Sequence, residues 1–202
     1  MTAVALPSLP APWMAVPRLL DFGVIAQPPL GGVEQRISRL GSRWAVDFTD
    51  LPSMNSVYGQ ALMAARFKAR ASGSTVSCAW PQPAFATAIG TPLVDGAAQA
   101  GTTLNIKGLT PGTTGIKSGL FFSLSVSSRN YLYCVTADAT ADGAGKAALS
   151  IAPMLRASPA DAAAISFAAP TIEGFIQGQV EQWQLAMRTS LAIAPFTIQE
   201  VQ

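Results

Sequence analysis

The stretch Ser42–Asp50, with the sequence SRWAVDFTD, alternates between apolar and polar or small side chains along its length. Trp44, Val46 and Phe48 fall on one side of an extended chain. Because successive side chains of a β-strand point to opposite faces, this alternation predicts a half-buried strand. The segment Val33–Leu40 is predicted to be a second strand, separated from the first by a single glycine.

The periodicity changes after this strand. From Met54 to Arg70, apolar residues recur every three or four positions, which predicts an amphipathic helix. Ser53 is its predicted N-cap, and Gly73 lies just past its end. We expect this helix to cover one face of the sheet, because no other segment has a comparable helical pattern. Ser74–Trp80 then returns to a strand pattern.

From Gln82 to Ala152 the chain becomes rich in Gly, Thr, Ser and Ala and poor in charged residues. Four segments there are predicted to be strands: Thr102–Leu109, Gly119–Ser127, Asn130–Ala137 and Lys146–Ala152. Short strands with glycine-containing turns are typical of a small barrel. Further apolar segments follow it: Ala164–Ala168, Ile172–Val180, Trp183–Thr189 and Leu191–Val201. One hypothesis is that the last of these return to the first sheet, so that the barrel is an insertion.

Composition narrows the function classes. Half of the 202 residues are hydrophobic, which excludes disorder of the whole chain. Only 12% are charged, and the formal net charge is +2, so a strong basic field for DNA binding is not expected. A surface with so few charges suggests that much of it is covered by partners.

The chain contains no histidine, which excludes imidazole base catalysis, a serine–histidine–aspartate triad and histidine metal ligation. The two cysteines, Cys78 and Cys134, are too few for a four-cysteine zinc site. Both lie in strand-like segments and are interpreted as buried free thiols, with a disulfide left open. No cofactor and no metal site are expected.

The N-terminal stretch Met1–Pro17 carries no charged side chain and contains four prolines. The prolines and the late first positive charge do not fit a signal peptide. No apolar run of about 18 residues occurs anywhere, so no membrane span is predicted. We interpret residues 1–20 as an extended arm that docks on a neighbouring subunit through Trp13 and Met14.

Carboxylate pairs are the remaining catalytic option, since some hydrolases need no histidine. The candidates are Asp47 with Asp50 and Asp138 with Asp142, all of which fit solvated faces or turns better than a catalytic pair. Glu173 is compatible with a turn or with an interface carboxylate. No catalytic residue is therefore predicted, and the chain is expected not to be an enzyme.

Arg36, Arg39 and Arg43 form a local basic cluster, although Arg36 and Arg39 face opposite sides of a regular strand. Pairing at a rim or between subunits is the favoured interpretation, with a positive pore lining as the alternative. The predicted oligomer interface therefore consists of Trp13, Met14, Arg36, Arg39 and Arg43. Specific nucleic-acid binding is not expected.

Several segments together resemble tail-tip proteins of long-tailed phages. They are Val33–Phe48, then Leu51–Met54 with the helix, Ile116–Leu124, Tyr131–Tyr133, Gly143–Arg156 and Ala169–Gly174. The most similar group is the distal tail protein, or a minor tail protein, of siphophages. Leu120 stands where the strand entry of that group has an aspartate.

The resemblance implies a mainly β fold: a β-sandwich or split-barrel domain with one helix, plus an inserted small OB-like β-barrel. The predicted boundaries are 1–20 for the arm, 21–82 and 170–202 for the tail-ring domain, and 83–169 for the barrel. It further implies a homo-oligomeric, six-fold ring in the virion, assembled in the host cytoplasm. This ring joins the tail tube protein to the tail-tip hub protein, with tail fibres as further partners.

The alternative hypothesis is a β-barrel binding module for host-surface carbohydrate or single-stranded nucleic acid. Such a module requires exposed aromatic side chains on which a sugar or base can stack. Tyr131, Tyr133 and Trp183 are the candidates, although core packing is favoured for the two tyrosines.

Overall fold

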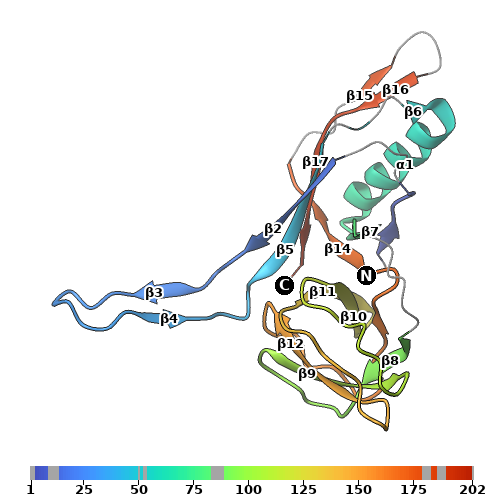
Figure 1. Ribbon diagram of the computed structural model, residues 1–202. Helices are drawn as coiled ribbons and strands as arrows, with labels where there is room; N and C mark the ends of the chain where they lie inside the picture. The colour runs from blue at the N-terminus through green and yellow to red at the C-terminus, as the bar shows by residue number, and fades with distance from the viewer. Residues whose placement is uncertain are drawn as a thin grey trace.

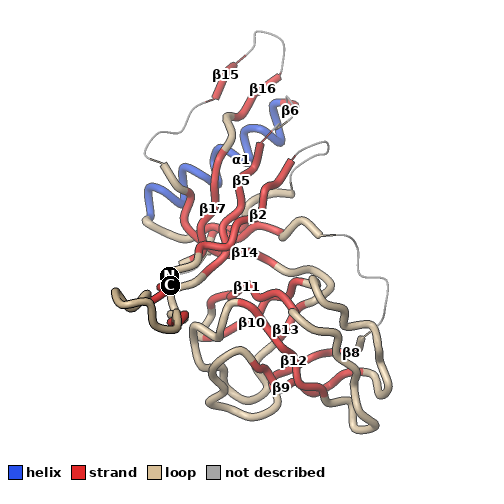
Figure 2. The backbone as a smooth tube through the Cα atoms, turned by 60° about the vertical axis from the view of Figure 1, so that its left-hand side comes forward, coloured by secondary structure: helices blue, strands red, loops and turns tan. Residues whose placement is uncertain are grey.

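The computed structural model describes residues 3–8, 14–49, 51, 54–82, 89–178, 183–185 and 190–201. Two bodies dominate it: a six-stranded sheet with a helix packed against it, and a barrel-like sheet next to it (Figures 1 and 2). The predicted fold class is confirmed, since the described residues are mainly β with a single helix. No helix in this part of the chain has the length and apolar character needed to cross a membrane.

The first body, here called the main sheet, has the strand order β1-β7-β14-β17-β5-β2. Its strands are β1 (Val4–Ala5), β7 (Val76–Ala79), β14 (Thr171–Ile176), β17 (Phe196–Glu200), β5 (Arg43–Thr49) and β2 (Met14–Leu20). All neighbours are antiparallel except β1 and β7. The strand predicted from Ser42–Asp50 is β5, and its Val46 and Phe48 are fully buried, as the alternation requires.

The helix α1 (Ser56–Ser72) packs against the main sheet with a narrow apolar face. It begins two residues later than predicted, because Met54–Asn55 form the short strand β6 instead. The predicted N-cap Ser53 lies outside the described residues. The inner face of the helix is buried and includes Leu62, Met63 and Ala69, whereas its outer face remains in solvent.

Gly73 ends the helix as predicted. Its φ is +60°, and its N–H donates to the carbonyl of Arg70 at 3.2 Å. The next N–H, of Ser74, donates to Ala69 at 2.9 Å, which completes a Schellman motif. The positive φ explains why a glycine stands there.

A three-stranded sheet extends the main sheet beyond the start of the helix (Figure 1). It has the order β15-β16-β6, with β15 at Trp183–Leu185 and β16 at Ser190–Ile193. The single strand predicted over Leu191–Val201 is therefore two strands. Pro195, which has no N–H to donate, lies in the gap between β16 and β17.

The second body, here called the barrel, has the strand order β13-β10-β11-β12-β9-β8. Its strands are β8 (Gly90–Val94), β9 (Thr103–Leu109), β10 (Phe121–Val126), β11 (Arg129–Val135), β12 (Ala147–Ala152) and β13 (Ile165–Ser166). An isolated bridge between Leu93 and Ala164 nearly closes the sheet on itself. Its interior is a separate apolar core that includes Leu104, Phe122 and Leu149.

The barrel is inserted between two neighbouring strands of the main sheet. β7 and β14 pair directly, with Ala79 opposite Thr171, although the whole barrel lies between them in sequence. The two chain segments that lead into and out of the barrel are joined by Trp80, whose N–H donates to the carbonyl of Pro170 at 2.8 Å. Gln82 adds hydrogen bonds to the backbone of Phe121 and Phe167.

The N-terminal region differs from the predicted extended arm that docks on a neighbouring subunit. β1 pairs with β7, and β2 pairs with β5 over seven residues, so both segments belong to the main sheet of their own chain. The predicted strand Val33–Leu40 is reduced to β4 (Gln35–Ile37). Its partner is β3 (Val24–Ala26) and not β5. The reason is that the chain turns around at residues 27–34, before it reaches β5.

Candidate interaction surface

A long two-stranded projection is the most distinctive feature of the molecule. β2 and β5 leave the main sheet side by side and continue as β3 and β4, which extend far from both bodies (Figure 1). We call residues 21–42, from the end of β2 to the start of β5, the β-arm. A two-stranded ribbon is marginally stable in water on its own, so the β-arm requires support at its base or from a partner.

The base of the β-arm is supported by hydrogen bonds around Asp21. The carboxylate accepts from the N–H of Gly23 at 2.8 Å and from the hydroxyl of Ser42 at 3.1 Å, and it forms an ion pair with Arg36. The Gly23 N–H is the largest cause that lowers the pKa of Asp21. The Arg43 guanidinium stacks over the Phe22 ring at 5.0 Å. These contacts fix the direction in which the β-arm leaves the sheet.

Large apolar side chains are exposed along the whole projection. Leu30 and Val33, at the tip, are 98% and 92% exposed. Of the fourteen large hydrophobic side chains that are exposed among the described residues, ten lie on β2 or the β-arm: Met14, Val16, Leu19, Phe22, Val24, Ile25, Leu30, Val33, Ile37 and Leu40. Exposed apolar side chains gathered on one projection are typical of surfaces that contact a partner.

The predicted interface residues fall mostly on this projection. Met14 begins β2 and is exposed, whereas Trp13 lies outside the described residues. Arg36 and Arg39 were expected on opposite sides of a regular strand. β4 ends at Ile37, however, and both arginines line one hollow between the base of the β-arm and the barrel. Arg43 instead stacks on Phe22 near the start of β5.

The described carboxylates of the pairs considered from the sequence each accept hydrogen bonds from other groups. Asp47 accepts hydrogen bonds from Arg18 and Thr197 in the main sheet. Asp138 accepts from the N–H of Ser118, which is the largest cause that lowers its pKa. Asp142 accepts from two N–H groups in its own turn. Asp50, the partner suggested for Asp47, lies outside the described residues.

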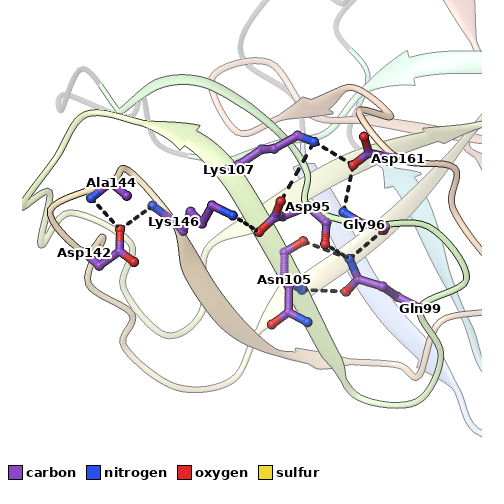
Figure 3. Close-up of polar contacts among 9 residues, drawn as sticks. All are labelled: Asp95, Gly96, Gln99, Asn105, Lys107, Asp142, Ala144, Lys146 and Asp161. Atoms are coloured by element: carbon purple, nitrogen blue, oxygen red, sulfur yellow. Dashed lines mark hydrogen bonds and ion pairs between the residues drawn. The ribbon is translucent and has the colours of Figure 1, made fainter.

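A polar cluster on the barrel surface is an alternating chain of charges (Figure 3). Lys107 bonds Asp161 at 2.6 Å and lies 3.9 Å from Asp95, whose other oxygen bonds Lys146 at 2.8 Å. The hydrogen bond to Lys107 lowers the pKa of Asp161, and the one to Asp95 raises the pKa of Lys146. Each carboxylate is compensated by an ammonium group, so the cluster fixes loops of the barrel.

Two buried glutamates connect the barrel to the main sheet. Glu200 accepts from the N–H groups of Leu132 and Trp44, both at 2.8 Å, and forms an ion pair with Arg156 at 2.7 Å. Glu173 accepts from the N–H of Asn130 at 2.9 Å. The two carboxylates thereby accept from alternate N–H groups of β11, those of Asn130 and Leu132. Glu173 lies within β14 and not in a turn, and its carboxylate joins the two bodies of one chain.

The two tyrosines considered for ligand stacking are engaged elsewhere. Tyr133 is fully buried in the barrel core. Tyr131 lies under the Arg156 guanidinium, 4.9 Å from the ring centre. Trp183 belongs to β15, and its side chain lies outside the described part of the structure. The two tyrosines therefore form no open platform.

Both cysteines are free thiols, as the favoured interpretation held. Burial raises the pKa of the Cys78 thiol to about 12 and also raises the pKa of Cys134, which is only partly buried.

Sequence reasoning missed the β-arm as an element. The signal that could have found it is the run Pro28–Gly32, a proline- and glycine-rich turn between two short apolar segments. Glu200 was also missed, because a single carboxylate near the end of a strand pattern resembles a solvent-facing residue. A scan against models of protein families finds no match to this chain, and a search of curated proteins finds no significant relative.

Proposed function

We propose that this chain is a structural subunit of the tail tip of a long-tailed bacteriophage. Copies of it assemble in the host cytoplasm into a closed ring, with six copies expected, which joins the tail tube to the baseplate hub and its fibres. The role is structural and not catalytic. The sequence resemblance to distal tail and minor tail proteins supplies the phage context of this proposal.

The observation that carries the proposal is the β-arm. A monomer gains nothing from a ribbon whose apolar side chains lie in water, whereas an assembly buries them and removes the free strand edges. The low content of charged residues, 12%, agrees with a chain whose surface is largely covered by neighbours. Contacts that repeat head to tail close into rings when the rotation between copies divides a full turn.

The first test is the absolute mass of the purified chain by light scattering at micromolar concentration and moderate salt. Six copies of 20.9 kDa predict a mass near 125 kDa. Negative-stain microscopy of the same sample then shows the symmetry of the particles. A mass of one copy at every concentration would contradict the proposal.

The second test removes the outer β-arm without touching the main sheet. Residues 24–37 are replaced by Asn-Gly, a two-residue hairpin turn, so that β2 and β5 remain paired. We expect a monomer with an unchanged circular dichroism spectrum. The control is Ala144→Asp, in an exposed turn of the barrel, which leaves the mass unchanged.

A further inference from the structure

We propose that the β-arm of one copy lies along the exposed face of helix α1 of the next copy, with Glu34 of the arm paired to Lys68 of the helix. This inference rests on the proposed ring, and it names the two surfaces that make its repeating contact. The occupant of the helix face is therefore a second copy of this chain.

The first observation is that the exposed apolar side chains form two separate groups. Besides the projection, the remaining four large hydrophobic side chains exposed among the described residues are Val57, Tyr58, Phe67 and Phe175. Three of them belong to α1, and Phe175 of β14 lines a hollow at the C-terminal end of that helix. We call this second group, with the exposed helix residues between them, the helix patch.

The outer face of α1 is unusual for a helix in solvent. Val57, Ala61, Ala64 and Lys68 recur at a spacing of three or four residues and are all exposed. Surface helices normally present charged and polar side chains there. The helix contains no acidic residue at all. The strip of Val57, Ala61, Ala64 and Lys68 is thus apolar, mildly basic and exposed to solvent.

The charges of the two surfaces are complementary. Glu34, next to the β-arm tip, bonds only the neutral amide of Gln27, at 2.8 Å, among the described residues. Lys68 has no ion-pair partner in the same part of the chain. Apart from Asp142, which caps its own turn, every other exposed aspartate or glutamate described has a cationic partner. Pairing Glu34 with Lys68 therefore satisfies both ions without breaking an existing pair.

The geometry requires two copies. The β-arm projects away from the main sheet on one side, and α1 lies on the opposite side (Figure 1). A β-arm therefore cannot reach its own helix, but it can reach that of a neighbour placed next to it. A contact between two different surfaces is heterologous and repeats from copy to copy, as a ring requires.

The lengths also match. At about 3.3 Å per residue, the chain from Phe22 to Leu30 extends over roughly 26 Å. The 17 residues of α1 extend over roughly 26 Å at 1.5 Å per residue. A neighbouring β-arm can thus cover the helix from end to end, which places its apolar side chains against Val57, Ala61 and Ala64.

Charge reversal tests the ion pair. We expect Glu34→Lys, and separately Lys68→Glu, to raise the dissociation constant of the assembly about five- to tenfold, because like charges then meet. Combining Glu34→Lys with Lys68→Glu restores the opposite signs and the original dissociation constant. The matched control combines Glu34→Lys with Lys117→Glu, on the barrel, which gives the same net charge without rescue.

Disulfide cross-linking tests the contact in trans. A tagged Val33→Cys variant and an untagged Ala64→Cys variant are mixed, oxidised and separated without reductant. We expect a cross-linked dimer that contains one tagged and one untagged copy. Replacing Ala64→Cys by Ala144→Cys, in the barrel, is the control and gives no such dimer.

The outcomes separate this inference from the proposed ring. Assemblies of normal mass that show neither the cross-link nor the charge rescue overturn the contact and leave the ring standing. A native chain that stays monomeric at every concentration overturns the ring and the contact together. Rescue together with the cross-link supports both.

Discussion

Glu200 illustrates how one side chain can determine the relation between two bodies. Its two oxygens accept from backbone N–H groups of β11 and β5, and Arg156 neutralises its charge. Arg156 in turn donates to the carbonyl of Val201 and packs against two tyrosine rings. Removing one partner of a buried ion pair costs more free energy of unfolding than the intact pair contributes, because the remaining charge stays buried without a counter-ion.

We therefore predict that Glu200→Gln lowers the free energy of unfolding by about 3 kcal/mol, since it leaves the Arg156 charge unpaired. Urea denaturation followed by circular dichroism measures the change. Glu34→Gln, in the exposed β-arm, is the matched control and changes the free energy of unfolding by less than about 0.5 kcal/mol when it is measured on native chain diluted until the copies are separate. Equal effects of the two substitutions would show that the pair is not a structural connection.

Trp44 lies at the same junction. Its ring packs edge-on against Trp80 and Phe121, with ring centres 6.1 and 5.0 Å away. We expect Trp44→Ala to destabilise the fold by about 3–5 kcal/mol, the usual cost of a large aromatic truncation in a core. Denaturant unfolding gives the value, and a near-neutral result would mean that the junction repacks without this ring.

The cysteines lead to a prediction about pH. Because burial raises the pKa of Cys78 from 9.0 to about 12, the thiol remains protonated at neutral pH. A raised pKa means that this group stabilises the fold below pH 9, and that its contribution is lost as the pH rises from 9 towards 12. We expect iodoacetamide at pH 8 to leave Cys78 unmodified in the native chain and to label it in urea.

Peptide mass spectrometry reads out this labelling. Cys134, which is only partly buried, serves as the internal comparison and reacts faster in the native chain. Rapid native labelling of Cys78 would indicate that β7 opens frequently.

At the scale of elements, the turn between β11 and β12 contains two glycines with different constraints. Gly145 has a φ of +73°, and a Cβ there would overlap the carbonyl oxygen of Leu109. A Cβ at Gly143 would meet nothing within 4 Å, and the φ of Gly143 is not positive. The two positions therefore form a matched pair within one turn.

We predict that Gly145→Ala destabilises the chain by about 2 kcal/mol or more, whereas Gly143→Ala stays within about 0.5 kcal/mol of the native value. Thermal unfolding of the two variants side by side tests this. Similar melting temperatures would mean that the loop and Leu109 move apart at little cost.

The strands that could be predicted from the sequence are those with a buried face. β9, β10, β11 and β12 begin and end within about two residues of the predicted segments, because their apolar alternation records one core and their turns contain glycine. The β-arm has no buried face in its own chain, so its alternation carries no information about pairing. Its arginines could be recognised as a cluster, but the turn at Pro28–Gly32 that arranges them was overlooked.

The same limit applies to the functional residues. Met14 and the arginines near Arg36 could be proposed as interface residues because apolar and basic side chains are visible in the sequence. Glu200 could not be recognised, because the N–H groups it accepts from belong to Leu132 and Trp44, far away in sequence. A pattern over neighbouring residues contains no trace of such a long-range contact.

For the whole molecule, the barrel and the main sheet differ in how self-sufficient they are. The barrel has its own core, in which Leu104, Ile106 and Phe122 are fully buried. The core of the main sheet includes Leu132, which belongs to the barrel strand β11. We expect residues 89–169 expressed alone to fold, and the main sheet with the barrel excised between Ala79 and Thr171 to remain unfolded.

Circular dichroism and thermal melting of the two fragments check this expectation. A cooperative transition of the excised main sheet would show that the junction contributes little. Loss of structure in the isolated barrel would show instead that the barrel depends on Glu173 and Glu200.

The closed connection at Trp80 and Pro170 also has a kinetic meaning. β7 and β14 are separated by about 90 residues, and bringing the ends of a flexible chain of that length together costs about 4 kcal/mol of entropy. A barrel that folds first brings these two ends together in advance. β7 and β14 then pair as though they were joined by a short turn. The barrel thus acts as an internal template that speeds the pairing of strands far apart in sequence.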